Sequence, residues 1–193
     1  WGAHHVDIGY WAAGLPAPIR AAGKPLALPV PGGYTPFSEY EVKFTYANGV
    51  IFNVRTTTDD SPFGQVLNPN GQRNGIRFVG TDGWIWVNRD EINASSRELL
   101  TKPLPDDAQK LYASDDHMGN FFQCMDSRND PICTAEVGHR SASVCHLGAI
   151  ALRTGKALQW DPDNEVFTGE AAAEANSYLA REMRKPYDYS FVS

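Results

Sequence analysis

Hydrophobic side chains occupy every second position from residue 40 to 46 and again from residue 50 to 54. This period of two is typical of β-strands that bury one face. Because a slip of one residue would turn every side chain to the opposite face, the two apolar faces coincide only if the intervening loop has three residues. We therefore expect a hairpin with Phe44 opposite Phe52 and with Gly49 in the left-handed conformation.

A second hairpin is predicted around Thr81-Asp82-Gly83, with Phe78 opposite Trp86. Large apolar side chains lie on both sides of this hairpin, so the face that is turned away from the core is too apolar to face water. We expect a second subunit to cover it, which predicts a homo-oligomer formed through the sheet face. Between the two hairpins, residues 58–73 are polar and rich in glycine, proline and asparagine, which indicates a loop.

Outside this region the apolar spacing changes to that of helices. Residues 1–15 are predicted to form a helix that ends at Gly14. Three more helices are expected towards the C-terminus: one whose N-cap is Ser114, a long one from about residue 134 to 153, and a last one from about residue 169 to 183.

Strands followed by helices in one chain predict an α+β fold, with a largely antiparallel open β-sheet and helices on one face. The length of 193 residues suits a single domain. We expect that domain to cover residues 1–193, with an extended tail from about residue 185.

Composition and charge exclude some classes of function. A net charge of -6 argues against a nucleic-acid-binding protein, which needs a basic surface for phosphate contacts. The chain contains no run of 18 apolar residues of the kind that spans a membrane. Its three cysteines form no C-x-x-C pair, and we expect them to be reduced, partly buried thiols.

Two nucleotide-binding motifs are absent from the chain. No two glycines are separated by a single residue, so the G-x-G-x-x-G turn of dinucleotide-binding domains cannot occur, and there is no phosphate-binding P-loop. We expect this chain alone to bind no cofactor, so that any redox chemistry needs a nucleotide site supplied elsewhere.

The densest chemical cluster is His4-His5-Val6-Asp7 near the N-terminus. On a helix, His4 and Asp7 are neighbours at positions i and i+3. A carboxylate beside an imidazole fixes the tautomer of the ring, and this arrangement suits a general acid/base. Two other interpretations stay open: a structural His–Asp pair at a helix N-terminus, and a metal site, for which no spaced carboxylate or cysteine completes a ligand set.

A second polar cluster covers residues 136–141 and includes His139 and Arg140. It would lie at the start of the long predicted helix, where polar residues are also a common structural feature. Ser141 is a poor candidate nucleophile because no G-x-S-x-G turn surrounds it.

The opening segment Gly2-Ala3-His4-His5-Val6-Asp7-Ile8, followed by Trp11, resembles the start of the C-terminal domain in Gfo/Idh/MocA oxidoreductases, in particular a bacterial subgroup. Further segments are similar to that subgroup, in the same order and along nearly the whole chain. They are Tyr46-Ala47-Asn48-Gly49-Val50, Gly75-Ile76-Arg77-Phe78-Val79-Gly80, Gly83-Trp84 with Val87 and Arg89, Asn120-Phe121-Phe122 to Ser127-Arg128, Gly138-His139-Arg140-Ser141, Cys145-His146-Leu147 and Trp160-Asp161-Pro162.

The resemblance implies an N-terminal Rossmann domain, missing from this chain, that holds NAD or NADP. It also implies hydride transfer at a carbinol carbon of a sugar or cyclitol. The family's Asp-x-x-x-His-x-x-Asp motif places its histidine on His4 and its last aspartate on Asp7, while its first aspartate falls on the residue before Trp1. His4 is therefore expected to be the catalytic acid/base or to bind the substrate hydroxyl, and Asp7 to orient it. His5, His139 and Arg140 are candidate substrate contacts, although the last two also fit a helix cap.

These expectations describe the substrate-side domain of an NAD(P)-dependent sugar oxidoreductase, inactive without its nucleotide-binding domain. Two alternatives stay open. One is a stand-alone sugar-binding or assembly module, and the other is a sugar lyase or isomerase that uses His4, His5 and Asp7. Because the chain begins at Trp1 rather than Met, its compartment is not fixed; a soluble bacterial protein, cytoplasmic or exported, fits the resemblance.

Overall fold

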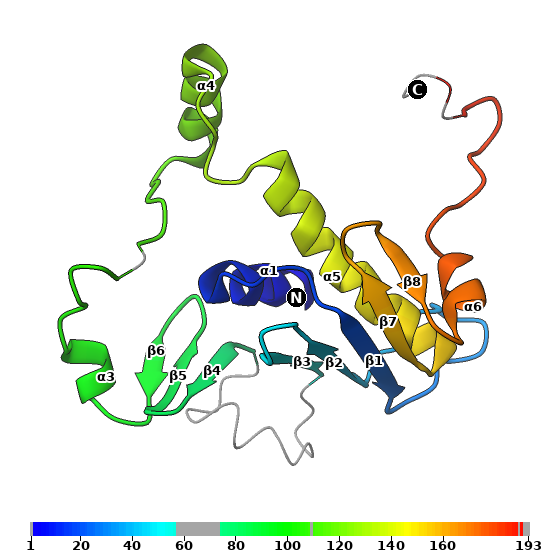
Figure 1. Cartoon of the computed structure of the whole chain (residues 1–193), viewed down its shortest axis with the longest axis horizontal. Coiled ribbons are helices and arrows are strands. Elements are labelled where there is room, and N and C mark those ends of the chain that lie inside the picture. The colour runs from blue at the N-terminus through cyan, green and yellow to red at the C-terminus, as the bar shows by residue number, and fades with distance from the viewer. Residues whose placement is uncertain (1, 57–73, 109, 189, 191–193) are drawn as a thin grey trace. The chain divides into compact units, whose positions relative to one another are not determined.

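The computed structural model describes residues 2–56, 74–108, 110–188 and 190 (Figure 1). The predicted loop at residues 58–73 lies outside the described residues. The chain forms two compact units. The first unit contains Trp1–Leu15 and Thr56–Cys145, and the second contains Pro16–Arg55 and His146–Ser193.

The second unit is built on a five-stranded sheet with the strand order β3-β2-β1-β7-β8, in which all neighbouring strands are antiparallel. Its elements are β1 (Arg20–Pro25), β2 (Tyr40–Thr45), β3 (Ile51–Arg55), the second half of α5 (Ala135–Thr154), β7 (Ala157–Asp161), β8 (Val166–Thr168) and α6 (Ala172–Asn176).

The register of the β2–β3 hairpin is the predicted one. Phe44 lies opposite Phe52, and the Tyr46 N–H donates to the Val50 carbonyl at 3.0 Å across a three-residue loop. Gly49 has a φ of 85°, as the predicted left-handed conformation requires. The alternation of apolar and polar residues therefore specified this hairpin correctly.

Helix α5 covers the apolar face of the five-stranded sheet. Val42, Phe44 and Leu158 are buried on that face. The helix comes so close to the central strand β1 that a Cβ atom added to Gly23 would lie 2.7 Å from the carbonyl carbon of Ala151. Side chains on the opposite face of the sheet, among them Lys43 and Asn53, are exposed. The predicted α+β fold, with an antiparallel sheet and helices on one face, is confirmed.

The first unit contains a three-stranded antiparallel sheet in the order β4-β5-β6. Its elements are α1 (Gly2–Ala13), β4 (Ile76–Gly80), β5 (Gly83–Val87), β6 (Ile92–Ala94), α3 (Glu98–Thr101), α4 (His117–Ser127) and the first half of α5.

The predicted register of the β4–β5 hairpin is wrong by one residue. Gly80 pairs with Gly83, so the loop is Thr81-Asp82, and Trp86 lies opposite Arg77 instead of Phe78. The physical reason is that Gly83 has a φ of 145°, which lets it begin the strand directly after a two-residue loop. In this register Trp86 is buried. Association through this hairpin stays a prediction.

Two of the four predicted helices end where they were expected to end, and the bounds of the other two were wrong. Helix α1 ends before Gly14, which has a φ of 56°, and α5 ends before Gly155, which has a φ of 62°, both as predicted. The N-cap of α4 is Asp116 rather than Ser114, because the Asp116 carboxylate accepts from the Gly119 N–H at 2.9 Å. The Ser114 hydroxyl donates instead to the Asp116 carbonyl at 3.3 Å.

The last predicted helix is much shorter than expected, since α6 covers only Ala172–Asn176 instead of residues 169–183. The Asn176 side chain accepts from the Phe167 N–H at 2.8 Å and donates to the Phe167 carbonyl at 3.0 Å, which ties the end of the helix to β8. Beyond Asn176 the hydrogen bonds span three residues instead of four: the Tyr178 N–H donates to the Ala175 carbonyl at 3.1 Å, and the Leu179 N–H donates to the Asn176 carbonyl at 3.1 Å. The α-helix thus ends in tighter turns. The short strands β7 and β8, which frame this contact, were not predicted.

Within the residues that the structure describes, no helix combines the length and the apolar character needed to cross a membrane.

Replacing Gly23 with alanine is expected to destabilise the protein. The new methyl group would lie 2.8 Å from the Leu152 Cα and 2.7 Å from the Ala151 carbonyl carbon, and backbone atoms cannot move aside as the end of a side chain can. Overpacking of this kind costs about 1–3 kcal/mol or more. Urea unfolding at equilibrium measures the change.

Gly138→Ala is the matched control, because a Cβ atom at this position in α5 would have nothing within 4 Å. It should stabilise the helix by up to about 1 kcal/mol. Equal effects of the two substitutions on the free energy of unfolding would show that α5 does not press on β1 at Gly23.

Candidate functional site

Helix α1 carries the cluster that the sequence singled out. Val6 and Gly9 are the buried residues of the helix and fix which side of it faces the unit. His4 and Asp7, three residues apart, are both exposed, and His5 is half-buried. The structure therefore presents His4 and Asp7 on neighbouring positions of the accessible side of α1, as their spacing predicted.

The carboxylate of Asp7 acts on a thiol of α5. Burial raises the pKa of the half-buried Cys145 thiol, and the negative charge of Asp7 raises it further. The two groups therefore lie within electrostatic range of each other. A thiol with a raised pKa is a poor nucleophile at neutral pH, which argues against a catalytic cysteine at this position.

Tyr10 lies beside the polar start of α5. Burial raises the pKa of the Tyr10 hydroxyl, the positive charge of Arg140 lowers it, and the negative charge of Glu136 raises it. Two residues of α1 thus interact electrostatically with α5: Asp7 acts on Cys145, and Arg140 and Glu136 act on Tyr10.

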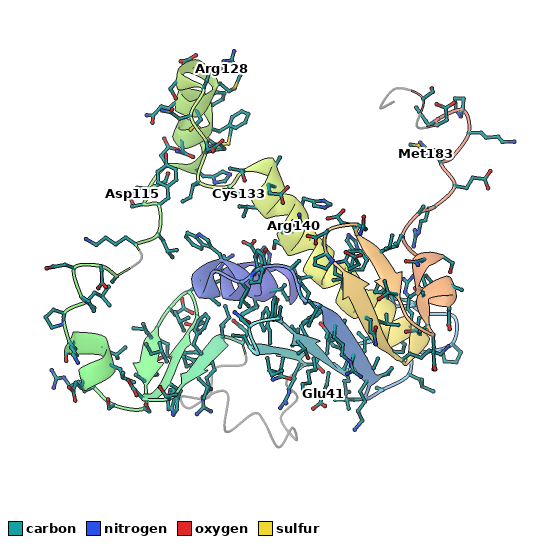
Figure 2. The ribbon with its side chains drawn as sticks, in the orientation of Figure 1. Glu41, Asp115, Arg128, Cys133, Arg140 and Met183 are labelled. Carbon is teal, nitrogen blue, oxygen red and sulfur yellow. The ribbon has the colours of Figure 1, made fainter. Side chains whose placement is uncertain are left out.

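Arg140, which Figure 2 labels on α5, forms an ion pair with a residue of its own helix. Its Nε donates to Glu136 Oε1 at 2.7 Å, one helical turn away. The guanidinium is half-buried whereas the carboxylate is largely exposed. Partial burial makes a guanidinium more useful for recognising an anionic or hydroxylated ligand, because solvent screens it less. His139, the next residue, is exposed on α5.

The structure thus places Asp7 and Tyr10 of α1 within electrostatic range of the first half of α5. Neither effect involves His4 or His5, so these effects do not place either histidine beside Arg140. The sequence had assigned no role to Tyr10 or Cys145. The pair Glu136–Arg140 was visible as an i, i+4 spacing, but its electrostatic effect on Tyr10 depends on how two distant segments pack, which no spacing in the sequence shows.

Among the described residues, no group of three or more histidine, cysteine, aspartate or glutamate side chains is arranged to hold a metal ion. All three cysteines are free, with Cys124 and Cys145 half-buried and Cys133 exposed. Helix α1 thus carries an accessible imidazole and carboxylate, and α5 carries an oriented guanidinium. These groups are of the kinds that transfer protons and bind hydroxyl or anionic groups.

Two solved structures share the fold. The WlbA dehydrogenase from Bordetella pertussis, solved with NADH and UDP-GlcNAcA, is 16% identical and superposes with a TM-score of 0.51 over 83% of this chain and 43% of its own. A putative oxidoreductase from Thermotoga maritima is 16% identical, with a TM-score of 0.54 over 81% of this chain and 44% of its own. The chain therefore spans less than half the length of either neighbour.

A sequence model of the Gfo/Idh/MocA group, described as "Oxidoreductase family, C-terminal alpha/beta domain", matches residues 42–189. No curated protein sequence matches the chain.

Removing the charge of Asp7 is expected to lower the pKa of the Cys145 thiol, because that charge raises it in the wild type. With Cys124 and Cys133 replaced by serine, Asp7→Asn should increase the rate of Cys145 alkylation at pH 8 by about two- to fivefold, since only the thiolate reacts. The rate is measured with iodoacetamide across a pH series.

Asp126→Asn is the control, because it removes an equal charge from an exposed position of α4. An Asp7→Asn rate that matches the control would contradict the placement of α1 beside α5.

Proposed function

The chain belongs to the family of Gfo/Idh/MocA oxidoreductase C-terminal α/β domains, and from this we propose that it is the substrate-side domain of an NAD(P)-dependent dehydrogenase that acts on a hydroxyl group of a sugar or cyclitol. The observation that carries the proposal is the family match over residues 42–189, joined to the His4–Asp7 arrangement on α1. Two observations support a separate nucleotide-binding domain. The dinucleotide-binding motif is absent from this sequence, and the chain covers less than half of each structural neighbour.

In the proposed reaction a carbinol carbon loses a hydride and its hydroxyl group loses a proton. Bound NAD or NADP would accept the hydride. An imidazole nitrogen of His4 takes the hydroxyl proton, and the carboxylate of Asp7, one turn away on the same side of α1, keeps the ring in the tautomer that can accept it. His4 is exposed in this chain and so accessible to a substrate.

Substrate contacts are proposed for His5, His139 and Arg140. Arg140 is the strongest of these candidates, because its ion pair with Glu136 fixes the direction of a half-buried guanidinium. The UDP-GlcNAcA in the WlbA complex shows that a dehydrogenase of this fold can accept a sugar that carries anionic groups. A sugar or cyclitol with such a group would suit Arg140. We propose that both units of residues 1–193 serve this one substrate domain, and that it turns nothing over alone.

Replacing His4 with glutamine in the full-length protein is expected to lower kcat by about 10²- to 10⁴-fold, the usual contribution of a general acid/base. The affinity for the dinucleotide should not change, because His4 lies outside any nucleotide motif. Nicotinamide absorbance with a panel of sugars and cyclitols measures turnover, and calorimetry measures dinucleotide binding.

The matched control is His117→Gln, which changes an exposed histidine of α4 in the same unit without altering α1. Unchanged kcat in the His4 variant would remove the acid/base assignment. Tight binding of NAD or NADP by the 193-residue chain alone would contradict the proposed division between two domains.

A further inference from the structure

Helix α4 buries one polar residue, Asn120. Asn120 is 7% exposed, its Nδ2 donates to the Tyr112 hydroxyl at 2.6 Å, and its Oδ1 accepts from the Ile132 N–H at 3.0 Å. These two bonds fasten the helix to the segments that precede and follow it. Cys124, one turn further along, is half-buried on the same side. The inner side of α4 is therefore built around a polar amide.

The opposite side of α4 is apolar and faces outwards. Its large side chains occur at positions i, i+3, i+4 and i+7, which form one continuous stripe, and their exposed fractions run from 49% to 57%. We call them the α4 stripe: Met118, Phe121, Phe122 and Met125. The rings of Phe121 and Phe122 contact each other edge to face at 5.7 Å, but the described residues leave half of each side chain uncovered.

Both ends of α4 have ordinary caps. Asp116 caps the N-terminus through its bond to the Gly119 N–H. Arg128, labelled in Figure 2, closes the C-terminus in the left-handed conformation, and its N–H is bonded to the Cys124 carbonyl at 2.9 Å. An amphipathic helix normally turns its apolar stripe towards a core. Because Asn120, and not this stripe, is bonded to the neighbouring segments, we expect the α4 stripe to be covered by a surface outside the described residues.

The size of the α4 stripe indicates what kind of surface that is. If a large side chain covers about 200 Å², four half-exposed ones present about 400 Å². A stable interface between free proteins needs about 800 Å² from each partner. A stripe of this size is sufficient, however, when the partner is tethered, because a covalent link raises its effective concentration to about the millimolar range.

We propose that the α4 stripe is the docking surface for the nucleotide-binding domain of the same polypeptide. This inference rests on the proposed function. Helix α4 belongs to the same compact unit as α1, and the domain that brings a nicotinamide ring to His4 must lie against that unit. The domain that completes the reaction thereby also covers the apolar side chains, and α4 holds it in place for hydride transfer.

Photo-cross-linking of the full-length protein tests this directly. Phe122→p-benzoylphenylalanine keeps an aromatic side chain in the α4 stripe and reacts with whatever touches it. The expected product has the mass of one chain, with residue 122 joined to a peptide of the nucleotide-binding domain. The same substitution at Gln123, an exposed position off the stripe, should give less than about a tenth of this product. Phe121→p-benzoylphenylalanine repeats the test if the first variant does not fold.

Three results would overturn the inference: a product with the mass of two chains, which would place a second copy on the stripe; cross-links only within residues 1–193; or equal yields at positions 122 and 123. Dinucleotide binding by the same full-length sample separates this failure from that of the proposed function. If the protein binds NAD or NADP but position 122 does not cross-link to the nucleotide-binding domain, only the docking surface is wrong.

Discussion

The close approach of α5 to β1 at Gly23 is the contact on which the five-stranded sheet depends. β1 is the central strand, paired with β2 on one side and with β7 on the other. It therefore joins the hairpin that precedes α5 in the chain to the hairpin that follows it. Only a residue without a side chain lets the backbone at Ala151 and Leu152 come this near. The resulting spacing between helix and sheet sets the depth at which Phe44 and Leu158 are packed, and both are almost completely buried.

The parts of the fold that could be predicted from the sequence are those in which one strand face is apolar and the other is polar. The β2–β3 register followed from that contrast and from one glycine at the turn. In the β4–β5 hairpin both faces are apolar, so alternation could not distinguish two registers that differ by one residue, and the conformation of Gly83 decided between them. The length of α6 was wrong for a different reason. Asn176 is tied to a strand that the sequence had not revealed, and the backbone beyond it forms tighter turns instead of continuing the helix.

In the candidate site, too, local features could be predicted from the sequence and packing between distant segments could not. The placing of His4 and Asp7 on the accessible side of α1 follows from helical spacing alone. The position of α1 against α5 depends on packing between segments more than 120 residues apart, and the sequence carries no signal for it. This packing lets the charge of Asp7 act on Cys145, and the charges of Arg140 and Glu136 act on Tyr10. Residue types in the sequence suggested the candidate chemistry, which stays a prediction, whereas these electrostatic effects could be found only in the structure.

Helix α4 shows the limit of reading burial from amphipathicity. Its apolar spacing correctly predicted a helix, and the usual inference would place that stripe in the core of this chain. The structure buries Asn120 instead and leaves the apolar side outwards. A hydrophobic stripe establishes that some surface covers it, but not which one. In an enzyme whose active site lies between two domains, each domain supplies only part of the catalytic groups. Each domain likewise supplies only one side of the apolar contacts that hold the two domains together. The buried amide and the exposed stripe of α4 are therefore accounted for together by the proposed docking of a second domain, whereas packing within the described residues accounts only for the amide.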